Sequence, residues 1–354
     1  MNRLIFLVIA IVLTPIQAFA TETGNWPEMK KILQKDSLKV LDIGNSYTDD
    51  ATALLPLITS ESGSDISNMC LYKAVRGSAS FKTWYDTFYD RDFQNYYIQK
   101  VLGGISANIA TGDGTAFDGS PFREALSNEQ WDIIIIHQVS GFAPYYDLWS
   151  STNAGGYLSE LLDIIKKLQP QAAIGFLLIH SYGSNYWGNI EKSSLERWQK
   201  ISESTKELTE NYCIDIVIPY GTAVQNLRCS PLNNAYDLTR DGTHLEYGLA
   251  RYAAACCYYQ SIIYPRSGIS VLGNSARYDV SNLNSQNPSI SVNDSNAEVA
   301  QKAAIIAAMY PYTCLEPASF DEIINGLNGD LDRDGIITIE DITRLVEIYL
   351  KTIH

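Results

Sequence analysis

The sequence predicts an α/β fold with a five-stranded parallel sheet covered by helices on both faces. Two observations predict it. Short apolar runs with strand character alternate with segments whose apolar residues recur at helical spacing. Strands joined by helices form right-handed βαβ units, and such sheets are buried on both faces. Because ligands bind beyond the carboxyl ends of the strands in these sheets, residues that follow a strand are the first candidates for a functional site.

The five predicted strands span residues 39–43, 66–74, 132–136, 173–179 and 214–218. The clearest predicted helices span residues 49–62, 157–168, 190–211, 245–262 and 296–309. Two stretches interrupt the alternation. Residues 102–121 are rich in small residues and predict a long loop or hairpin near the cleft, and the polar residues 265–294 predict an irregular excursion between two helices.

Residues 1–20 have the pattern of a secretory signal peptide. One basic residue precedes an apolar core, and the small-x-small end at Ala18 and Ala20 predicts cleavage after Ala20. A retained membrane anchor is the competing interpretation, but Pro15 and Gln17 interrupt the apolar run, which is short for a span. We therefore expect a secreted, periplasmic or cell-surface protein that is not inserted in a membrane after cleavage.

Charge and cysteine content exclude several classes of function. The net charge is −14, so the chain has no attraction for nucleic acid or anionic membranes, and we expect neither as a partner. The six cysteines form no CxxC pair and have no histidine at zinc spacing, so zinc is not expected. One or two disulfides are compatible with export, but the sequence does not assign their pairing.

The first candidate for chemistry is Ser46, in the tripeptide that follows the first predicted strand. Its hydroxyl is expected at the carboxyl edge of the sheet and at the positive N-terminal end of a helix. An ordinary strand-to-helix turn is the alternative. Gly-Asn-Ser recurs at residues 273–275, where no strand precedes it, and we interpret that copy as structural. A serine hydroxyl is a poor nucleophile unless a base removes its proton.

The best-placed base is His244, which follows Asp241 by three residues. Asp241 could bind one imidazole nitrogen while the other nitrogen faces Ser46. A plain capping role for Asp241 is the alternative, but the early serine, the parallel sheet and the late Asp-x-x-His together favour a catalytic triad. The other histidines are the C-terminal His354 and two at strand ends: His137, for which we favour a structural role, and His180, a candidate pocket residue.

Together these residues resemble the SGNH (GDSL-type) hydrolases over about residues 38–310. The resemblance is to a bacterial branch with a first block Gly-Asn-Ser-Tyr-Thr (residues 44–48) and a last block Arg-Asp-Gly-x-His-Leu (residues 240–245). It implies a flavodoxin-like three-layer α/β/α fold, with Ser46 as nucleophile, His244 as general acid/base and Asp241 as its orienting carboxylate. Asparagine stands at residue 45 where the family more often has aspartate.

The resemblance also implies an oxyanion hole. Its expected donors are the backbone N–H of Ser46 and that of Gly77, which follows the second strand. A simple turn glycine is the alternative for Gly77. The family's third donor is an asparagine in a Gly-x-Asn-Asp block, which this sequence lacks, and Gln138 after the third strand is the expected substitute.

These residues predict a serine esterase that removes acetyl or other small acyl groups from carbohydrate, without a metal or organic cofactor for the chemistry. The 23 tyrosines agree with a carbohydrate substrate. A lipid or lysophospholipid esterase with the same triad remains open. So does a non-catalytic carbohydrate-binding or assembly module on the same fold.

A composition shift near residue 316 predicts a catalytic domain over residues 21–315 and a small acidic module over residues 316–354. The module has the spacing of an EF-hand-type calcium loop, with a glycine at the sixth position. It resembles one repeat of a dockerin, which implies a structural Ca²⁺ and a cohesin-like scaffold partner. The expected ligands are Asp330, Asp332, Asp334, the backbone carbonyl of Ile336 and Asp341.

Overall fold

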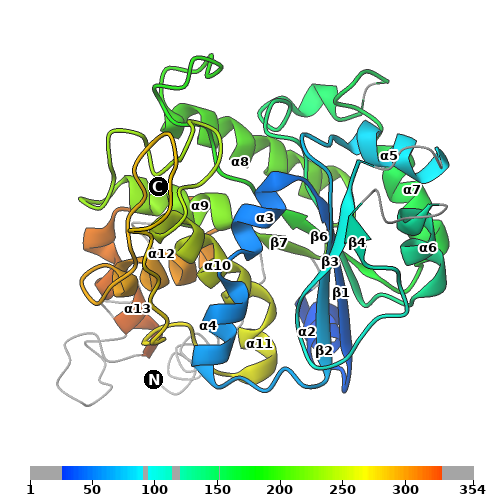
Figure 1. Cartoon of the computed structure of the whole chain (residues 1–354), viewed down its shortest axis with the longest axis horizontal. Helices are drawn as coiled ribbons and strands as arrows, with labels where there is room; N and C mark the ends of the chain where they lie inside the picture. The colour runs from blue at the N-terminus through cyan, green and yellow to red at the C-terminus, as the bar shows by residue number, and fades with distance from the viewer. Residues whose placement is uncertain (1–25, 91–94, 114–119, 151, 329–354) are drawn as a thin grey trace, which may run out of the picture.

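The structure is a computed structural model that describes residues 26–90, 95–113, 120–150 and 152–328. The predicted signal peptide and the predicted calcium loop at residues 330–341 lie outside these residues. The described residues form one central sheet with helices around it (Figure 1). The predicted α/β class is confirmed. None of the described helices is long and apolar enough to cross a membrane.

The sheet has seven strands in the order β4-β3-β2-β1-β5-β6-β7. Strands β2, β1, β5, β6 and β7 pair in parallel, and their order is that of a flavodoxin-like sheet. The strands are β1 (Leu38–Gly44), β2 (Met69–Val75), β3 (Tyr97–Leu102), β4 (Gly112–Asp113), β5 (Ile133–Ile136), β6 (Ala173–Leu177) and β7 (Ile216–Ile218).

The predicted count of five strands is wrong because two antiparallel strands extend the β2 edge. Strand β3 pairs antiparallel with β2, and β4 pairs antiparallel with β3. Strand β3 lies near the edge of the sheet, where polar Gln99 and Lys100 are tolerated, so its apolar signal is weak. Strand β4 has two residues, which is too short for any pattern, and it falls in the stretch predicted as a loop or hairpin.

The predicted helix at residues 49–62 is two helices. Helix α3 ends at Thr52, and Pro56 lies in the first turn of α4, where the missing N–H of proline costs no hydrogen bond.

The helices are α2 (Trp26–Leu33), α3 (Ser46–Thr52), α4 (Leu55–Ser62), α5 (Phe81–Tyr89), α6 (Pro121–Asn128), α7 (Leu158–Leu168), α8 (Ser194–Asn211), α9 (Tyr220–Arg228), α10 (Leu249–Ile262), α11 (Tyr264–Ser267), α12 (Ala297–Met309) and α13 (Phe320–Asn328), with short 3-10 helices η2 (Tyr146–Leu148) and η3 (Pro317–Ser319).

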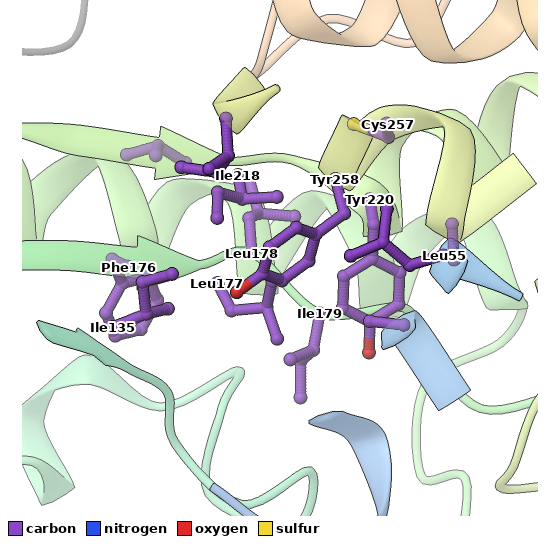
Figure 2. Packing of buried hydrophobic residues seen from close by; sticks show 14 of the residues in the cluster. Leu55, Ile135, Phe176, Leu177, Leu178, Ile179, Ile218, Tyr220, Cys257 and Tyr258 are labelled. Atoms are coloured by element: carbon purple, nitrogen blue, oxygen red, sulfur yellow. The ribbon is translucent and has the colours of Figure 1, made fainter. Parts of the chain in front are cut away.

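Helix α10 is the centre of the helical layer on one side of the sheet. It contacts α3, α4, α9 and α12, whereas α5, α6 and α7 contact one another on the other side (Figure 1). Almost every residue of α10 is buried, as expected for a helix covered all round. Figure 2 shows Tyr258 of α10 in the same buried cluster as Leu177 of β6 and Ile218 of β7, so this helix helps to close the core over the sheet.

The start of the predicted acidic module packs on the main body. Helix α13 contacts α12, and the side chain of Phe320 is buried in the main core. Asp321 pairs with Lys302 of α12. Apolar side chains of residues 316–324 therefore pack into the main core. The predicted domain boundary between residues 315 and 316 stays a prediction.

A polar network crosses the core beneath the first strand-to-helix turn. Asp42 of β1 is fully buried, and its carboxylate accepts hydrogen bonds from Thr48 Oγ1 at 3.1 Å and from Tyr258 Oη at 3.2 Å. Thr48 Oγ1 lies 2.9 Å from His137 Nε2. Burial raises the pKa of Asp42 to about 7, since two neutral hydroxyls compensate little for the lost hydration of a carboxylate.

We predict that Asp42→Asn changes the pH dependence of stability. In the folded chain Asp42 keeps its proton up to pH about 7, whereas in the unfolded chain it releases it near pH 4. The wild type therefore loses stability as the pH rises from about 4 to about 7, and the neutral asparagine does not. The difference in unfolding free energy should shift in favour of the variant by on the order of 4 kcal/mol across this range.

Urea denaturation at several pH values measures this shift, with Asp36→Asn on the exposed segment before β1 as the control. A difference between Asp42→Asn and the wild type that stays constant with pH would contradict the assignment.

Candidate active site

The turn after β1 is built so that helix α3 begins at Ser46. Asn45 is the N-cap: its Oδ1 accepts a hydrogen bond from the Tyr47 N–H at 3.0 Å, and its Nδ2 donates to the Ala79 carbonyl at 3.1 Å. Gly44 has to be small, because a Cβ there would lie 2.1 Å from His137 Nε2. Ser46 is half-buried at the junction of strand and helix.

Ser46, His244 and Asp241 form one continuous line of hydrogen bonds. Ser46 Oγ lies 2.8 Å from His244 Nε2, and His244 Nδ1 lies 2.7 Å from Asp241 Oδ2. Ser46 and His244 are 198 residues apart, so the fold alone brings them together. This is the arrangement in which a histidine removes the proton of a serine hydroxyl.

The carboxylate of Asp241 is held by its own loop. Its Oδ1 accepts hydrogen bonds from the backbone N–H groups of Thr243 at 2.9 Å and His244 at 2.8 Å. Partial burial raises the pKa of Asp241, but the hydrogen bonds from His244 and Thr243 outweigh it and hold the pKa well below its usual range. Asp241 is therefore ionised at neutral pH. It fixes the proton of the neutral imidazole on Nδ1, which leaves the Nε2 lone pair facing Ser46.

Two buried side chains support this loop from below. The Thr243 carbonyl lies 2.7 Å from Tyr47 Oη and 2.8 Å from His180 Nε2. A carbonyl only accepts, so His180 donates from Nε2, and its Nδ1 faces Tyr220 Oη at 3.1 Å. Burial lowers the pKa of His180 well below its ordinary value, which keeps it neutral. His180 is fully buried, so the expectation that it lines an open pocket is not met.

His137 lies under the elbow as a neutral side chain. Its Nε2 accepts from the Asn45 N–H at 3.3 Å, so its proton is on Nδ1, which donates to the Gln138 carbonyl at 3.0 Å. Burial lowers the pKa of His137 to about 4. This geometry agrees with the structural role expected for this histidine.

A buried ion pair connects the serine helix to the histidine loop. Asp50, on the last turn of α3, is fully buried. Its Oδ1 accepts from Arg240 Nη1 at 2.7 Å and from Arg251 at 2.7 and 3.0 Å, and its Oδ2 accepts from the Leu245 N–H at 2.9 Å. Arg240 and Leu245 flank the Asp241–His244 turn on both sides, so this carboxylate sets the position of the turn relative to Ser46.

The expected oxyanion donors differ in whether they already donate hydrogen bonds within the protein. The Ser46 N–H begins α3 and has no intrahelical acceptor, and Gly77 lies in the exposed turn that follows β2. Neither N–H has a hydrogen-bond acceptor within the described ranges. Gln138 is buried: its Nε2 donates to the Gly155 carbonyl at 2.7 Å, and its Oε1 accepts from the Val139 N–H at 2.9 Å. One N–H of the Gln138 amide is therefore occupied.

An aromatic loop follows β6 and leads to α8. The Gly183 N–H donates to the Gly242 carbonyl at 2.9 Å, which joins this loop to the Asp241–His244 turn. Gly242 has φ +87°, and a Cβ there would lie 2.7 Å from the Tyr186 ring, so glycine is needed on both counts. Next to Tyr186, the side chain of Trp187 is 88% exposed.

The part of the chain that the structure describes contains no group of three His, Cys, Asp or Glu residues that could hold a metal ion.

Fold and site together define an α/β protein with a serine, a histidine and an aspartate in hydrogen-bond contact at the carboxyl edge of a mostly parallel sheet. A family model described as a domain of unknown function (DUF4886) matches residues 39–306, and the chain belongs to this family. The matched range begins in β1, just before the elbow, and ends in α12, so it includes every residue of the site.

Two solved structures are similar to the chain. A DUF4886 family protein from Bacteroides uniformis is 24% identical with a TM-score of 0.62, and the match covers 79% of this chain and 98% of that one. A protein from Slackia heliotrinireducens, provisionally described as an SGNH hydrolase, is 13% identical with a TM-score of 0.42 and coverages of 64% and 98%. The first likeness supports the fold. No curated protein matches the sequence.

Sequence reasoning missed the residues that hold the site together. Asp50 and Arg251 belong to no motif, and their partners are far away along the chain. Tyr47 and Arg240 belong to the two blocks at residues 44–48 and 240–245, but the blocks do not reveal what their side chains bind. An acidic residue on the first helix together with an arginine beside Asp241 is the one signal that could have suggested the ion pair.

We predict that Asp50→Asn destabilises the fold far more than Asp49→Asn. Replacing Asp50 leaves two arginines facing a neutral amide in the core, and breaking a buried ion pair costs about 3–5 kcal/mol. The adjacent Asp49 is partly exposed, pairs with Lys73 and accepts a hydrogen bond from Tyr97 Oη; an asparagine amide oxygen can keep both contacts, so its replacement should cost about 1 kcal/mol. Urea denaturation of both variants measures the contrast, and equal losses would show that Asp50 is not the anchor described above.

Proposed function

We propose that this protein is an exported serine esterase of the SGNH type that removes acetyl or other small acyl groups from carbohydrate. One observation carries the catalytic part: the line of hydrogen bonds from Asp241 through His244 to Ser46 Oγ, with distances of 2.7 and 2.8 Å. The tautomer set by Asp241 and the position of Ser46 at the start of α3 both support it.

In the proposed reaction, Ser46 Oγ attacks the ester carbonyl while His244 Nε2 takes its proton. Asp241 stabilises the imidazolium that forms, and His244 then gives the proton to the leaving sugar oxygen. Water hydrolyses the acyl-enzyme with His244 as base, which returns Ser46 to its starting state. The three side chains balance this proton transfer, so the proposal requires no cofactor for the chemistry.

The Ser46 and Gly77 N–H groups are the proposed donors to the tetrahedral oxyanion. Both lack an acceptor among the described residues, which is the state a preorganised oxyanion hole requires. Arg76, which precedes Gly77, donates its backbone N–H to the Gly44 carbonyl at 3.1 Å, so this turn is held beside the elbow. Gln138 remains the proposed third donor, through the N–H of its amide that does not bind the Gly155 carbonyl.

The aromatic loop supports carbohydrate as the part of the substrate that carries the acyl group. Trp187 exposes its ring on the loop joined to the Asp241–His244 turn, and Ile190, three residues on, is 78% exposed. The loop also carries the exposed neutral amide of Asn185, whose Nδ2 donates to the Ala235 carbonyl at 3.1 Å. Exposed aromatic rings stack on the C–H faces of sugars, and neutral amides hydrogen bond to hydroxyl groups.

The proposed export, the calcium ion and the cohesin-like partner rest on sequence patterns in residues that the structure does not describe. They add a place of action to the proposal and take no part in the chemistry. The acyl-transfer residues all lie within the family match at residues 39–306.

We predict that Ser46→Ala and His244→Ala each abolish hydrolysis of a soluble acetyl ester, with a loss in kcat of about 10⁴-fold or more. Asp241→Asn should also be severe, because the amide favours the wrong imidazole tautomer. Ser275→Ala, in the second Gly-Asn-Ser, serves as the matched control. Labelling of Ser46 by a fluorophosphonate, followed by peptide mapping, identifies the nucleophile directly.

An unlabelled Ser46 in a folded protein would instead favour the non-catalytic binding module. If Ser275→Ala abolished activity and Ser46→Ala did not, the nucleophile would be Ser275, and the assignment of Ser46 would be wrong.

We predict that Trp187→Ala raises KM for an acetylated oligosaccharide about tenfold and leaves kcat/KM for a small soluble acetyl ester unchanged. The loss corresponds to one aromatic stacking contact. Tyr89→Ala, at the exposed end of α5, is the aromatic control. A wild-type enzyme that hydrolyses lysophospholipid and leaves acetylated oligosaccharide untouched would replace the carbohydrate assignment by the lipid one.

A further inference from the structure

Two cysteines far apart in the chain lie side by side on the helical side of the molecule. Cys229 Sγ and Cys314 Sγ are 3.3 Å apart, and 85 positions separate them in sequence. All six cysteines lie within the described residues and are free, and this is the one pair of sulfur atoms in contact among them. Cys70, Cys256 and Cys257 are buried in the core.

The backbone around both cysteines is held in place. Cys229 caps the C-terminal end of α9. The segment that carries Cys314 runs along the same helix, because Thr222 Oγ1 donates to the Pro311 carbonyl and the Leu315 N–H donates to Asn226 Oδ1 at 2.8 Å. A disulfide needs the two sulfurs about 2.0 Å apart, so from 3.3 Å the two sulfurs have to approach by little more than about 1 Å.

We propose that Cys229 and Cys314 form a reversible disulfide in which Cys229 is the attacking thiol and Cys314 the resolving thiol. Cys229 is exposed, while Cys314 is less exposed. Both line a pocket of about 480 Å³ against α8, whose walls include Trp198, Gln199 and Tyr312. This pocket gives a disulfide donor access to the pair.

The electrostatics of the pair agree with this division of roles. The hydrogen bond from the Cys314 thiol lowers the pKa of Cys229 to about 7, and the same bond raises the pKa of Cys314 well above its ordinary value. Of the two thiols, Cys229 is therefore the one that more readily becomes a thiolate, which is the form that attacks a disulfide.

The co-reactant is a small-molecule or protein disulfide. The Cys229 thiolate attacks one sulfur of the donor: a mixed disulfide forms, the donor S–S bond breaks, and one donor thiol leaves with the electron pair. Cys314 then loses its proton and attacks the Cys229 sulfur, which expels the second donor thiol. Two protein thiols are oxidised by two electrons, and the donor is reduced to two thiols.

The cross-link closes a loop that contains Arg240, Asp241 and His244 together with α10 and α12. Because a disulfide restricts the unfolded chain, it stabilises the fold, and more so when the loop is long. The pair therefore ties the segment carrying the Asp241–His244 turn to α9 when the surroundings are oxidising. This inference does not depend on the proposed esterase activity.

Ellman's disulfide tests the pair in the full-length, reduced chain carrying Cys213→Ser, which removes the other exposed thiol. We expect two thionitrobenzoate equivalents per chain, no retained adduct, a mass loss of two hydrogens and a linked peptide joining Cys229 to Cys314. The further change Cys314→Ser should release one equivalent and retain one adduct on Cys229. A retained adduct with both cysteines present, or a link to any other cysteine, would overturn the proposal.

Thermal unfolding gives a second readout. Oxidised glutathione should raise the unfolding midpoint of the Cys213→Ser chain by on the order of 5 °C relative to dithiothreitol. The unfolding midpoint of the chain that also carries Cys314→Ser should be the same in both reagents. Equal shifts in both chains would show that another reaction is responsible.

Discussion

The buried carboxylate of Asp50 is the constraint on which the site depends. It lies on the helix that begins at Ser46, and it binds Arg240, Arg251 and the Leu245 N–H. A charge with no access to water tolerates little displacement, because every lost hydrogen bond exposes its desolvation cost. The serine helix and the histidine turn are thereby fixed to each other through the core, with Ser46 Oγ and His244 Nε2 2.8 Å apart.

Two further sets of buried polar contacts support the site: one holds the histidine turn and the other holds the serine elbow. Tyr47 and His180 hold the Thr243 carbonyl from below, so the turn cannot tilt away from the elbow. Asp42 and His137 support the elbow itself through Thr48 and the Asn45 N–H. Both buried histidines are neutral, as burial lowers their pKa values. The side chains that hold the site are buried, whereas Ser46 and His244 are only partly buried and reach the surface.

The loops around the site are distinct from the buried side chains that support it. The turn after β2 carries Gly77 beside the elbow, and the loop after β6 carries Tyr186 and Trp187 beside the Asp241–His244 turn. Loops at the carboxyl edge can thus vary in what they bind without altering the buried support, which is the general advantage of this sheet type. Cys229 and Cys314 lie at the end of α9 and act on the stability of the same segment from a different surface.

The sequence by itself determined the α/β class, the five parallel strands and the candidates Ser46, Asp241 and His244, because apolar periodicity and a short Asp-x-x-His block are local patterns. It could not determine the two edge strands β3 and β4: one is partly polar and the other has two residues, and both are strands only because β2 offers them an edge. Nor could it find the contacts that Asp50, Tyr47 and Arg251 make, or the contact between Cys229 and Cys314. Only the tertiary structure decided these, since their partners lie tens to hundreds of residues away and a buried charge or thiol has no distinctive spacing along the chain.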